Sequence, residues 1–341
     1  MRIYPLTTEV NDQTALPTPL HMPEVDITED QWPCGNDLLE RHKEIENLSP
    51  VLLNAQTPLA FAIDAPWGAG KTTFIKLWQA YLNKQGYKSI HLNVWESDFS
   101  EDPLLPLLSA IDEWVKGGDD DSAAKKSWNK AKKIVPGLLK GLTVASVKAS
   151  TLGILELDKE YEKVASNLTG EIAGDLVEQF TAKKEALEQF KQLIGKVIKA
   201  LPDEQLNLII FIDEIDRCRP TYAIELLERV KHLFDIDRLV FVLAVNREQL
   251  SKSLQGVYGS SFDGVNYLKR FIDMNYQLKI TDQKSYSQSL LQQQDISKYY
   301  ATRKDGDQLR ILQDTLGTLF KRFGYSLRDI NQTITRLRLI L

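Results

Sequence analysis

The chain has 341 residues, of which 43% are hydrophobic and 26% are charged, and its formal net charge is −5. These values predict a soluble globular protein of roughly two domains and exclude a disordered, fibrous or collagen-like chain. Residues 1–30 lack a basic start with an apolar core, and no apolar run of about 18 residues occurs, so neither a secretory signal nor a plain membrane span is predicted. Two cysteines, Cys34 and Cys218, are too few for a disulfide framework, so we expect two small buried apolar groups in a cytoplasmic protein.

The first half of the chain begins with a proline-rich segment and continues with alternating helices and strands. Residues 1–30 hold four prolines and little periodicity, which predicts an extended arm. The spacing of apolar residues then predicts a helix over 37–54, a strand over 59–64, a helix over 72–83, a strand over 88–95 and a helix over 104–115. Residues 116–201 carry helical patterns without a strand signal, which predicts an all-helical insert.

The second half returns to the alternation of strands and helices. Residues 208–212 and 239–245 are continuous apolar runs, typical of strands buried on both faces of a parallel sheet. The remaining patterns predict a helix over 221–234, a last strand over 274–280 and helices over 281–341. We therefore expect an α/β fold whose parallel sheet, flanked by helices, is built from residues 31–115 and 202–280.

A glycine-rich segment joins the first predicted strand to a predicted helix. It reads Ala65-Pro66-Trp67-Gly68-Ala69-Gly70-Lys71-Thr72, which fits the phosphate-loop pattern with alanine at its first glycine. Gly68 and Gly70 permit backbone angles that turn N–H groups toward one anion, and the helix adds its positive end. The Lys71 ammonium can reach the β- and γ-phosphates, and the Thr72 hydroxyl can bind Mg²⁺. The residues expected to bind the nucleotide are Pro66, Trp67, Gly68, Ala69, Gly70, Lys71, Thr72 and Thr73.

Two acidic residues end the apolar run at 208–212. Asp213 is placed to hold Mg²⁺ together with Thr72. Glu214 follows directly, and a carboxylate there can align water and take its proton during attack on the γ-phosphate. This pair favours a hydrolase over a nucleotide-dependent kinase, and the absence of an Asn-Lys-x-Asp segment favours ATP over GTP.

Several segments resemble the KAP family of P-loop NTPases. They are Pro66–Thr72, Asn93–Trp95, Ile212–Pro220, Phe241–Glu248 and Tyr267–Phe271. The run Asp216-Arg217-Cys218 is the most specific part, and the resemblance covers residues 33–280 with a weaker tail to 335. It implies an AAA-like (ASCE) fold in which residues 281–341 form a helical lid. In many members of the family a pair of membrane helices stands where residues 116–201 stand here.

The resemblance also implies roles for particular residues. Glu214 and Asn246 stand where the family often has aspartate; the former suits water activation and the latter suits a polar sensor of the γ-phosphate. Arg270 and Arg328 are candidates to touch phosphate, although surface salt bridges would explain them as well. Arg328 lies in a segment that resembles the Pro-Arg segment in the lid of the family, with Leu327 in place of the proline. The expected catalytic set is Lys71, Glu214, Asn246, Arg270 and Arg328.

Three further features of the expected site are less specific. Trp67 is expected in the core rather than beside the nucleotide. Asp216 and Arg217 either pair across the site or cap the loop after the strand. The adenine pocket is expected near residues 37–41.

The predicted insert carries a local excess of positive charge. Residues 122–155 contain seven lysines and no acidic residue, although the whole chain is acidic. Residues 134–152 place apolar side chains on one arc of a helix and lysines opposite it. One interpretation is contact with a membrane surface or nucleic acid, and the other is packing of the apolar arc within the insert.

The sequence thus leaves three functions open. The first is an ATPase that uses Mg²⁺ and whose turnover drives a conformational switch, acting on a protein partner that the sequence does not identify. The second is a nucleotide-gated interaction module with negligible turnover, and the third, a small-molecule kinase, is disfavoured by Glu214. Since the family includes phage- and plasmid-exclusion proteins, the resemblance implies a role in defence. The oligomeric state stays open.

Overall fold

The structure is a computed structural model that describes residues 32, 37–117, 122–149, 170–199, 207–233, 235–280, 282–303 and 306–340. The predicted arm at residues 1–30 and Cys34 lie outside this part of the chain.

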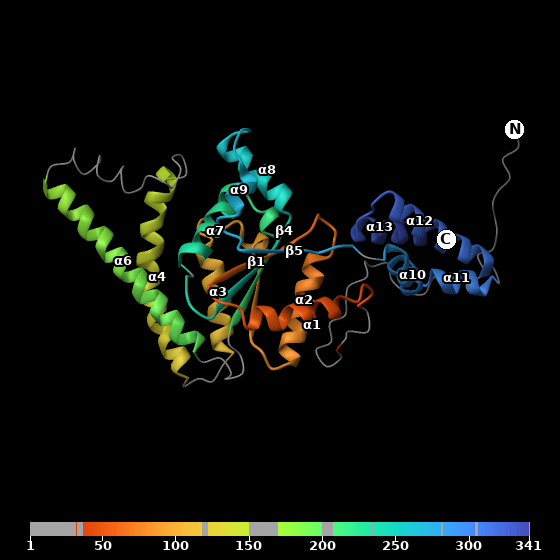
Figure 1. The fold of residues 1–341 in the computed structure, drawn as a ribbon, viewed down its shortest axis with the longest axis horizontal. Helices are drawn as coiled ribbons and strands as arrows, with labels where there is room; N and C mark the ends of the chain where they lie inside the picture. Colours follow the sequence, from red (N-terminus) through yellow and green to blue (C-terminus); the bar gives the residue numbers. More distant parts are fainter. Residues whose placement is uncertain are drawn as a thin grey trace, which may run out of the picture.

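The centre of the fold is a five-stranded parallel sheet with the strand order β2-β3-β4-β1-β5 (Figure 1). The strands are β1 (Leu59–Asp64), β2 (Ser89–Asn93), β3 (Leu208–Asp213), β4 (Leu239–Val245) and β5 (Met274–Gln277). The register pairs Asp64 with Val245 and Asn93 with Asp213, so the strands end at one edge of the sheet. Because β4 lies between β1 and β3, the segments after β1 and β3 are separated by the width of one strand. The predicted α/β fold is confirmed.

Helices cover both faces of the sheet. They are α1 (Arg41–Leu53), α2 (Lys71–Lys84), α3 (Leu104–Lys116), α7 (Pro220–Leu233), α8 (Arg247–Tyr258) and α9 (Gly264–Leu268). Ile209 and Phe211 of β3 pack in the cluster formed with α1 and α2, whereas Ile210 and Ile212 pack in the cluster formed with α3 and α7. Side chains alternate across a strand, so burial on both faces requires the continuous apolar run.

Three elements differ from their predicted bounds by more than one residue. Strand β5 ends at Gln277 rather than at residue 280. Helix α1 begins at Arg41 rather than at residue 37, because the Asp37 carboxylate accepts hydrogen bonds from the backbone N–H groups of Arg41 (2.9 Å) and His42 (2.8 Å). Strand β2 ends at Asn93 because the chain turns into the short 3₁₀ helix η1 (Trp95–Ser97).

In its described residues, 122–149 and 170–199, the insert has two long helices, α4 (Ala123–Ala149) and α6 (Gly170–Ile198), which pack along each other and extend away from the sheet (Figure 1). Trp128 of α4 and Phe190 of α6 are fully buried in the cluster that also contains α3. The Trp128 indole donates a hydrogen bond to Asp112 of α3 at 2.5 Å, which ties the insert to the core. Leu138, on the predicted apolar arc, is buried against the protein. No helix in the described part of the chain is long and apolar enough to cross a bilayer.

The C-terminal helices form a small bundle with a core of its own. They are α10 (Gln283–Gln293), α11 (Ile296–Thr302), α12 (Gly306–Arg322) and α13 (Leu327–Ile340). Leu291, Phe320 and Ile330 are among the buried residues that hold the bundle together. The bundle lies beyond β5, at the side of the sheet where α2 begins (Figure 1). We call residues 282–340 the lid.

Candidate functional site

The glycine-rich segment forms a tight loop between β1 and α2. Gly68 and Gly70 have φ angles of +78° and +88°, which residues with a Cβ atom rarely adopt. The loop is closed by a hydrogen bond from the Ala69 N–H to the Pro66 carbonyl at 3.3 Å. Helix α2 begins at Lys71, directly after the second of these glycines, so its free N–H groups face the loop. The backbone therefore has the geometry of an anion-binding nest.

The Lys71 side chain lies back across this loop. Its ammonium donates to the Ala65 carbonyl at 2.8 Å, and it lies 3.9 Å from Asp216 Oδ2. Only 9% of the side chain is exposed, and this burial lowers the pKa of Lys71, although Asp216 and Asp213 act in the opposite direction. The cation is thus held at the loop among carboxylates.

Asp213 presents one carboxylate oxygen without a partner to the same space. It ends β3 and is 1% exposed. Its Oδ1 accepts the Glu214 N–H at 2.8 Å, whereas Oδ2 is buried and, within the described residues, has no hydrogen-bond partner. Burial raises the pKa of Asp213, and the Thr72 hydroxyl partly offsets this effect. A buried, unpartnered oxygen beside a threonine hydroxyl is a donor set that suits Mg²⁺.

Glu214 is held by an arginine of its own loop. Its φ angle is +64°, and the chain continues into the short 3₁₀ helix η3 (Ile215–Arg217). Arg217 Nη1 lies 2.7 Å from Glu214 Oε1, and the Arg217 guanidinium lies over the Trp95 ring, 5.3 Å from its centroid. The sequence left open whether Arg217 pairs across the site or within the loop after the strand, and in the structure it pairs within that loop.

Asp216, in contrast, connects the acidic strand to the phosphate loop. Its Oδ2 accepts the Trp67 indole N–H at 2.6 Å. The prediction that Trp67 lies in the core was wrong: 47% of the residue is exposed, because it projects from the loop toward Asp216 rather than toward the sheet. Cys218 of the same segment is a small buried group, as predicted, and its burial raises its pKa to about 12.

The start of α13 packs directly on the phosphate loop. The Arg328 N–H donates to the Gly68 carbonyl at 3.3 Å. A Cβ placed on Gly68 would lie 2.6 Å from Ser326 Oγ, and one on Gly70 would lie 3.3 Å from Leu327 Cδ1. The lid therefore packs directly on the backbone of the loop, because Gly68 and Gly70 have no side chains to keep it away.

Two adjoining cavities lie around this contact. The smaller, of about 60 Å³, is lined by Trp67, Gly68, Gly70, Lys71, Thr72, Asp213, Glu214, Asp216, Arg217 and Arg328. The structure thus brings five of the eight predicted loop residues, the acidic pair and one of the two predicted arginines to one cavity. It adds Asp216 and Arg217, whose roles the sequence left open. Ala69 and Thr73 line the larger cavity instead, and Pro66 lines neither.

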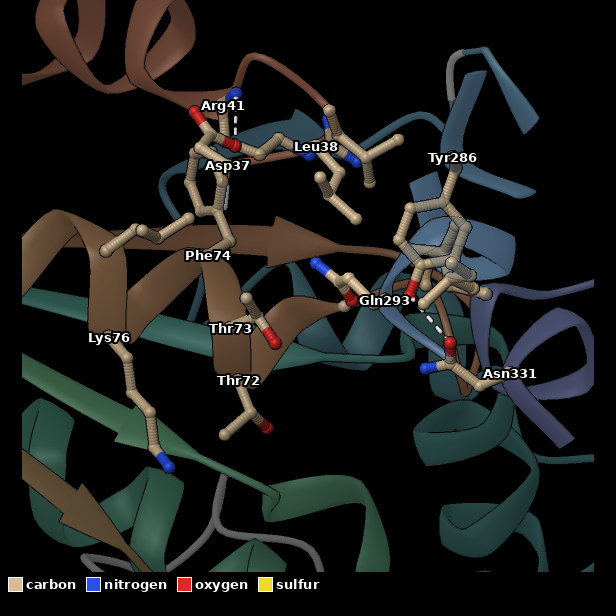
Figure 2. A pocket seen from close by; sticks show the side chains of 16 residues that line it. Asp37, Leu38, Arg41, Thr72, Thr73, Phe74, Lys76, Tyr286, Gln293 and Asn331 are labelled. Carbon is tan, nitrogen blue, oxygen red and sulfur yellow. Dashed lines mark hydrogen bonds between the residues drawn. The ribbon is translucent and has the colours of Figure 1, made fainter. Parts of the chain in front are cut away.

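The larger cavity, of about 270 Å³, lies between the segment before α1, the start of α2 and the lid (Figure 2). Leu38, Leu290 and Leu327 give it apolar walls, and Thr73 lies at the side of the phosphate loop. Asp37, Leu38, Leu39 and Arg41, from the segment where the sequence predicts the adenine pocket, border this cavity. The Asp37 carboxylate is occupied by backbone N–H groups of α1 and by His42.

Two lid residues in this cavity are paired with each other. The Tyr286 hydroxyl of α10 donates to Asn331 Oδ1 of α13 at 3.2 Å, as the dashed line in Figure 2 shows. Burial raises the pKa of Tyr286. This bond joins the two lid helices that form one wall of the cavity.

The structure does not bring two of the five predicted catalytic residues, Asn246 and Arg270, to the smaller cavity. Asn246 follows β4 and is 9% exposed, but its Oδ1 accepts the Gln249 N–H at 3.2 Å and so caps α8. Arg270 is exposed and precedes β5, near Asp273, whose N–H donates to the Ala60 carbonyl at the amino end of β1. Since the phosphate loop follows the carboxyl end of β1, Arg270 lies at the opposite end of the sheet and does not line the smaller cavity.

The comparisons with known proteins agree with this geometry. The KAP family P-loop domain matches residues 41–341. The chain is also 24% identical over 262 residues to the phage T7 exclusion protein of Escherichia coli (strain K12); the match covers 74% of this chain and 34% of that protein. The chain therefore spans about a third of the length of this relative. Because the family match extends over most of the chain, the protein belongs to the KAP family of P-loop domains.

Proposed function

We propose that this chain binds ATP together with Mg²⁺ and hydrolyses it. The observation that carries the proposal is the convergence of the phosphate loop, the acidic pair and a lid arginine on one cavity. Anion-binding and cation-binding groups meet there, which is the combination that a magnesium–nucleoside triphosphate requires.

The residues present fit both groups. The N–H groups of the loop and the Lys71 ammonium would hold the β- and γ-phosphates, and Thr72 and the unpartnered Asp213 oxygen would hold Mg²⁺. A bound Mg²⁺ would neutralise charge on the β- and γ-phosphate oxygens. Burial of the Lys71 ammonium and of the unpartnered Asp213 oxygen costs free energy, and the ligand would offset part of this cost by adding a phosphate to the first and a metal ion to the second.

Glu214 would act as the general base. Its carboxylate takes a proton from water while the water oxygen forms a bond to the γ-phosphorus. The bond between that phosphorus and the β–γ bridging oxygen breaks, and ADP and inorganic phosphate leave. Arg328, from the lid, would balance negative charge on the phosphate from the other side.

The larger cavity supports a purine base and favours adenine. Its apolar walls suit the faces of a base, and it opens beside Thr72 and Thr73, where the sugar and α-phosphate would follow. The Asp37 carboxylate is already occupied, so it is not available to accept the N1–H and amino group of guanine.

We further propose that the nucleotide sets the position of the lid and that this movement is the output. The contact between Gly68 and the start of α13 transmits any shift of the loop to the lid. The name of the E. coli relative suggests that the output serves phage exclusion. We also propose a protein partner for the lid, and contact of the lysine-rich residues 122–155 with anionic membrane or nucleic acid.

The test is phosphate release from ATP with and without Mg²⁺. We expect Mg²⁺-dependent release by the parent chain and loss of both release and tight ATP binding in Lys71→Ala. Lys84→Ala is the matched control, because Lys84 is exposed at the far end of the same helix. Release that persists in Lys71→Ala would show that the activity does not come from this site.

A second candidate is a nucleotide-gated module with negligible turnover. The pairing of Glu214 with Arg217 favours it, because the guanidinium holds one oxygen of the carboxylate and makes that carboxylate a weaker base toward water. Tight ATP binding without phosphate release by the parent would support this candidate over the ATPase.

A further inference from the structure

Arg217 contacts the proposed general base and also borders the space proposed for the phosphates. Its Nη1 atom is 2.7 Å from Glu214 Oε1. The same side chain borders the cavity that Lys71 and Thr72 also border. One cation thus contacts the base while it faces the space that a terminal phosphate would take.

We propose that Arg217 senses the γ-phosphate by exchanging partners. In this structure the guanidinium holds the Glu214 carboxylate. A terminal phosphate competes with that carboxylate for the same N–H groups, and when it wins, Glu214 is released to act on water. The inference rests on the proposed function, because it takes the smaller cavity to be the γ-phosphate site.

The backbone around Arg217 is fixed, so the exchange requires rotation of side-chain bonds alone. The Arg217 N–H donates to the Glu214 carbonyl at 3.1 Å, and the Cys218 N–H donates to the Ile215 carbonyl at 3.2 Å. Ile215 is fully buried and anchors the turn in the core. The Arg217 side chain, in contrast, is 29% exposed and has room to turn.

The competition favours the phosphate on electrostatic grounds. A terminal phosphate carries more negative charge than one carboxylate and offers three acceptor oxygens to the planar fork of an arginine. The stacking of Arg217 on Trp95 is a weak restraint, since that ring is half exposed. A diphosphate has no group in this position and leaves the pair with Glu214 intact.

A neighbouring arginine provides a matched control. Arg219 Nε lies 3.0 Å from Asp98 Oδ1, and the Arg219 guanidinium also donates to the carbonyls of Asp98 and Ser100. Arg219 is not among the residues that line the smaller cavity. It has the same charge at nearly the same place in the sequence but does not face the phosphates.

The experiment measures, by calorimetry with Mg²⁺, the affinities for ADP and for an imidodiphosphate analogue of ATP that is not hydrolysed. In Arg217→Ala we expect the analogue to bind roughly ten- to a hundredfold more weakly, the usual contribution of a charged hydrogen bond, with unchanged ADP affinity. Arg217→Lys should fall between this variant and the parent, and Arg219→Ala should match the parent. Unchanged ADP affinity also shows that the variant is folded.

A second arm tests the exchange itself. Glu214→Gln removes the competing charge, so it should tighten binding of the analogue more when Arg217 is present than in the Arg217→Ala background, where only the repulsion between carboxylate and phosphate is lost. Equal tightening in both backgrounds would overturn the exchange. A parent chain that binds both nucleotides, with a ratio of affinities that Arg217→Ala leaves unchanged, overturns the inference alone. A parent chain that binds neither nucleotide overturns the proposed function as well.

Discussion

The contact between the phosphate loop and the lid makes Gly68 a sensitive position. In Gly68→Ala, the new Cβ would lie 2.6 Å from Ser326 Oγ, 3.0 Å from Ser326 Cβ and 3.1 Å from Arg328 Cβ. The backbone φ of +78° is also one that alanine rarely adopts. Two separate penalties therefore fall on one substitution.

The two penalties can be separated in size. A residue with a Cβ in the left-handed region costs about 1–2 kcal/mol. Forcing a methyl group against packed neighbours adds about 1–3 kcal/mol. Gly86→Ala carries only the first penalty, because Gly86 has a φ of +79° and nothing within 4 Å of its Cβ position. We expect Gly68→Ala to lower the free energy of unfolding by about 2–5 kcal/mol and Gly86→Ala by about 1–2 kcal/mol.

Urea denaturation of the two variants, followed by circular dichroism, measures the difference. A Ser326→Gly background should reduce the effect of Gly68→Ala, because it removes the nearest atoms of the lid. If Gly68→Ala were no more destabilising than Gly86→Ala, and Ser326→Gly did not change its effect, the lid would not rest on the loop as described.

Three further predictions concern other parts of the molecule. Asp213→Asn should abolish the rise in melting temperature that Mg²⁺ gives in the presence of ADP. In the parent this rise should become smaller as the pH falls, because burial raises the pKa of Asp213 and protons then compete with Mg²⁺ for the carboxylate. Burial raises the pKa of the Asp112 carboxyl, but hydrogen bonds from Lys116, Lys132 and Trp128 outweigh this effect and hold that pKa below the ordinary 3.8. The ionised carboxylate therefore stabilises the fold above pH 3.8, and this stabilisation is lost as the pH falls further. In urea denaturation, the difference in free energy of unfolding between the parent and Asp112→Asn should become smaller in acid. Competition titrations should show ATP displacing a fluorescent ADP analogue at lower concentration than GTP, and equal displacement would contradict the adenine assignment.

Strands β3 and β4 were predictable because each has a local physical cause. Strands β3 and β4 are buried on both faces, so each must be apolar at every position, and the runs at 208–212 and 239–245 reflect this directly. The glycines of the phosphate loop were predictable for a similar reason, since Gly68 and Gly70 occupy backbone angles that other residues avoid.

The position of Arg270 shows a signal that was present but not used. A residue that precedes a parallel strand lies at the amino end of the sheet, whereas the phosphate loop and the acidic pair follow their strands. Arg270 precedes β5, so its place away from the cavity follows from chain order alone. Arg328 gives no such signal, because its contact with Gly68 depends on how the lid packs.

The environments of Trp67 and Arg217 depend on tertiary contacts. An aromatic residue in a sequence is most simply assigned to a core, but Trp67 projects from a tight loop, and its indole N–H donates to Asp216 of η3, 149 residues later in the chain. The pairing of Arg217 with Glu214 depends on the left-handed backbone at Glu214 and on the exposed face of Trp95. Neither condition leaves a pattern in the local sequence.

The most direct test of hydrolysis at this site is phosphate release by Glu214→Gln under single-turnover conditions with Mg²⁺. We expect ATP binding to be retained and the rate to fall roughly a hundredfold or more, the usual contribution of a positioned general base. Hydrolysis by Glu214→Gln at the parent rate would contradict the assignment of Glu214 as the general base.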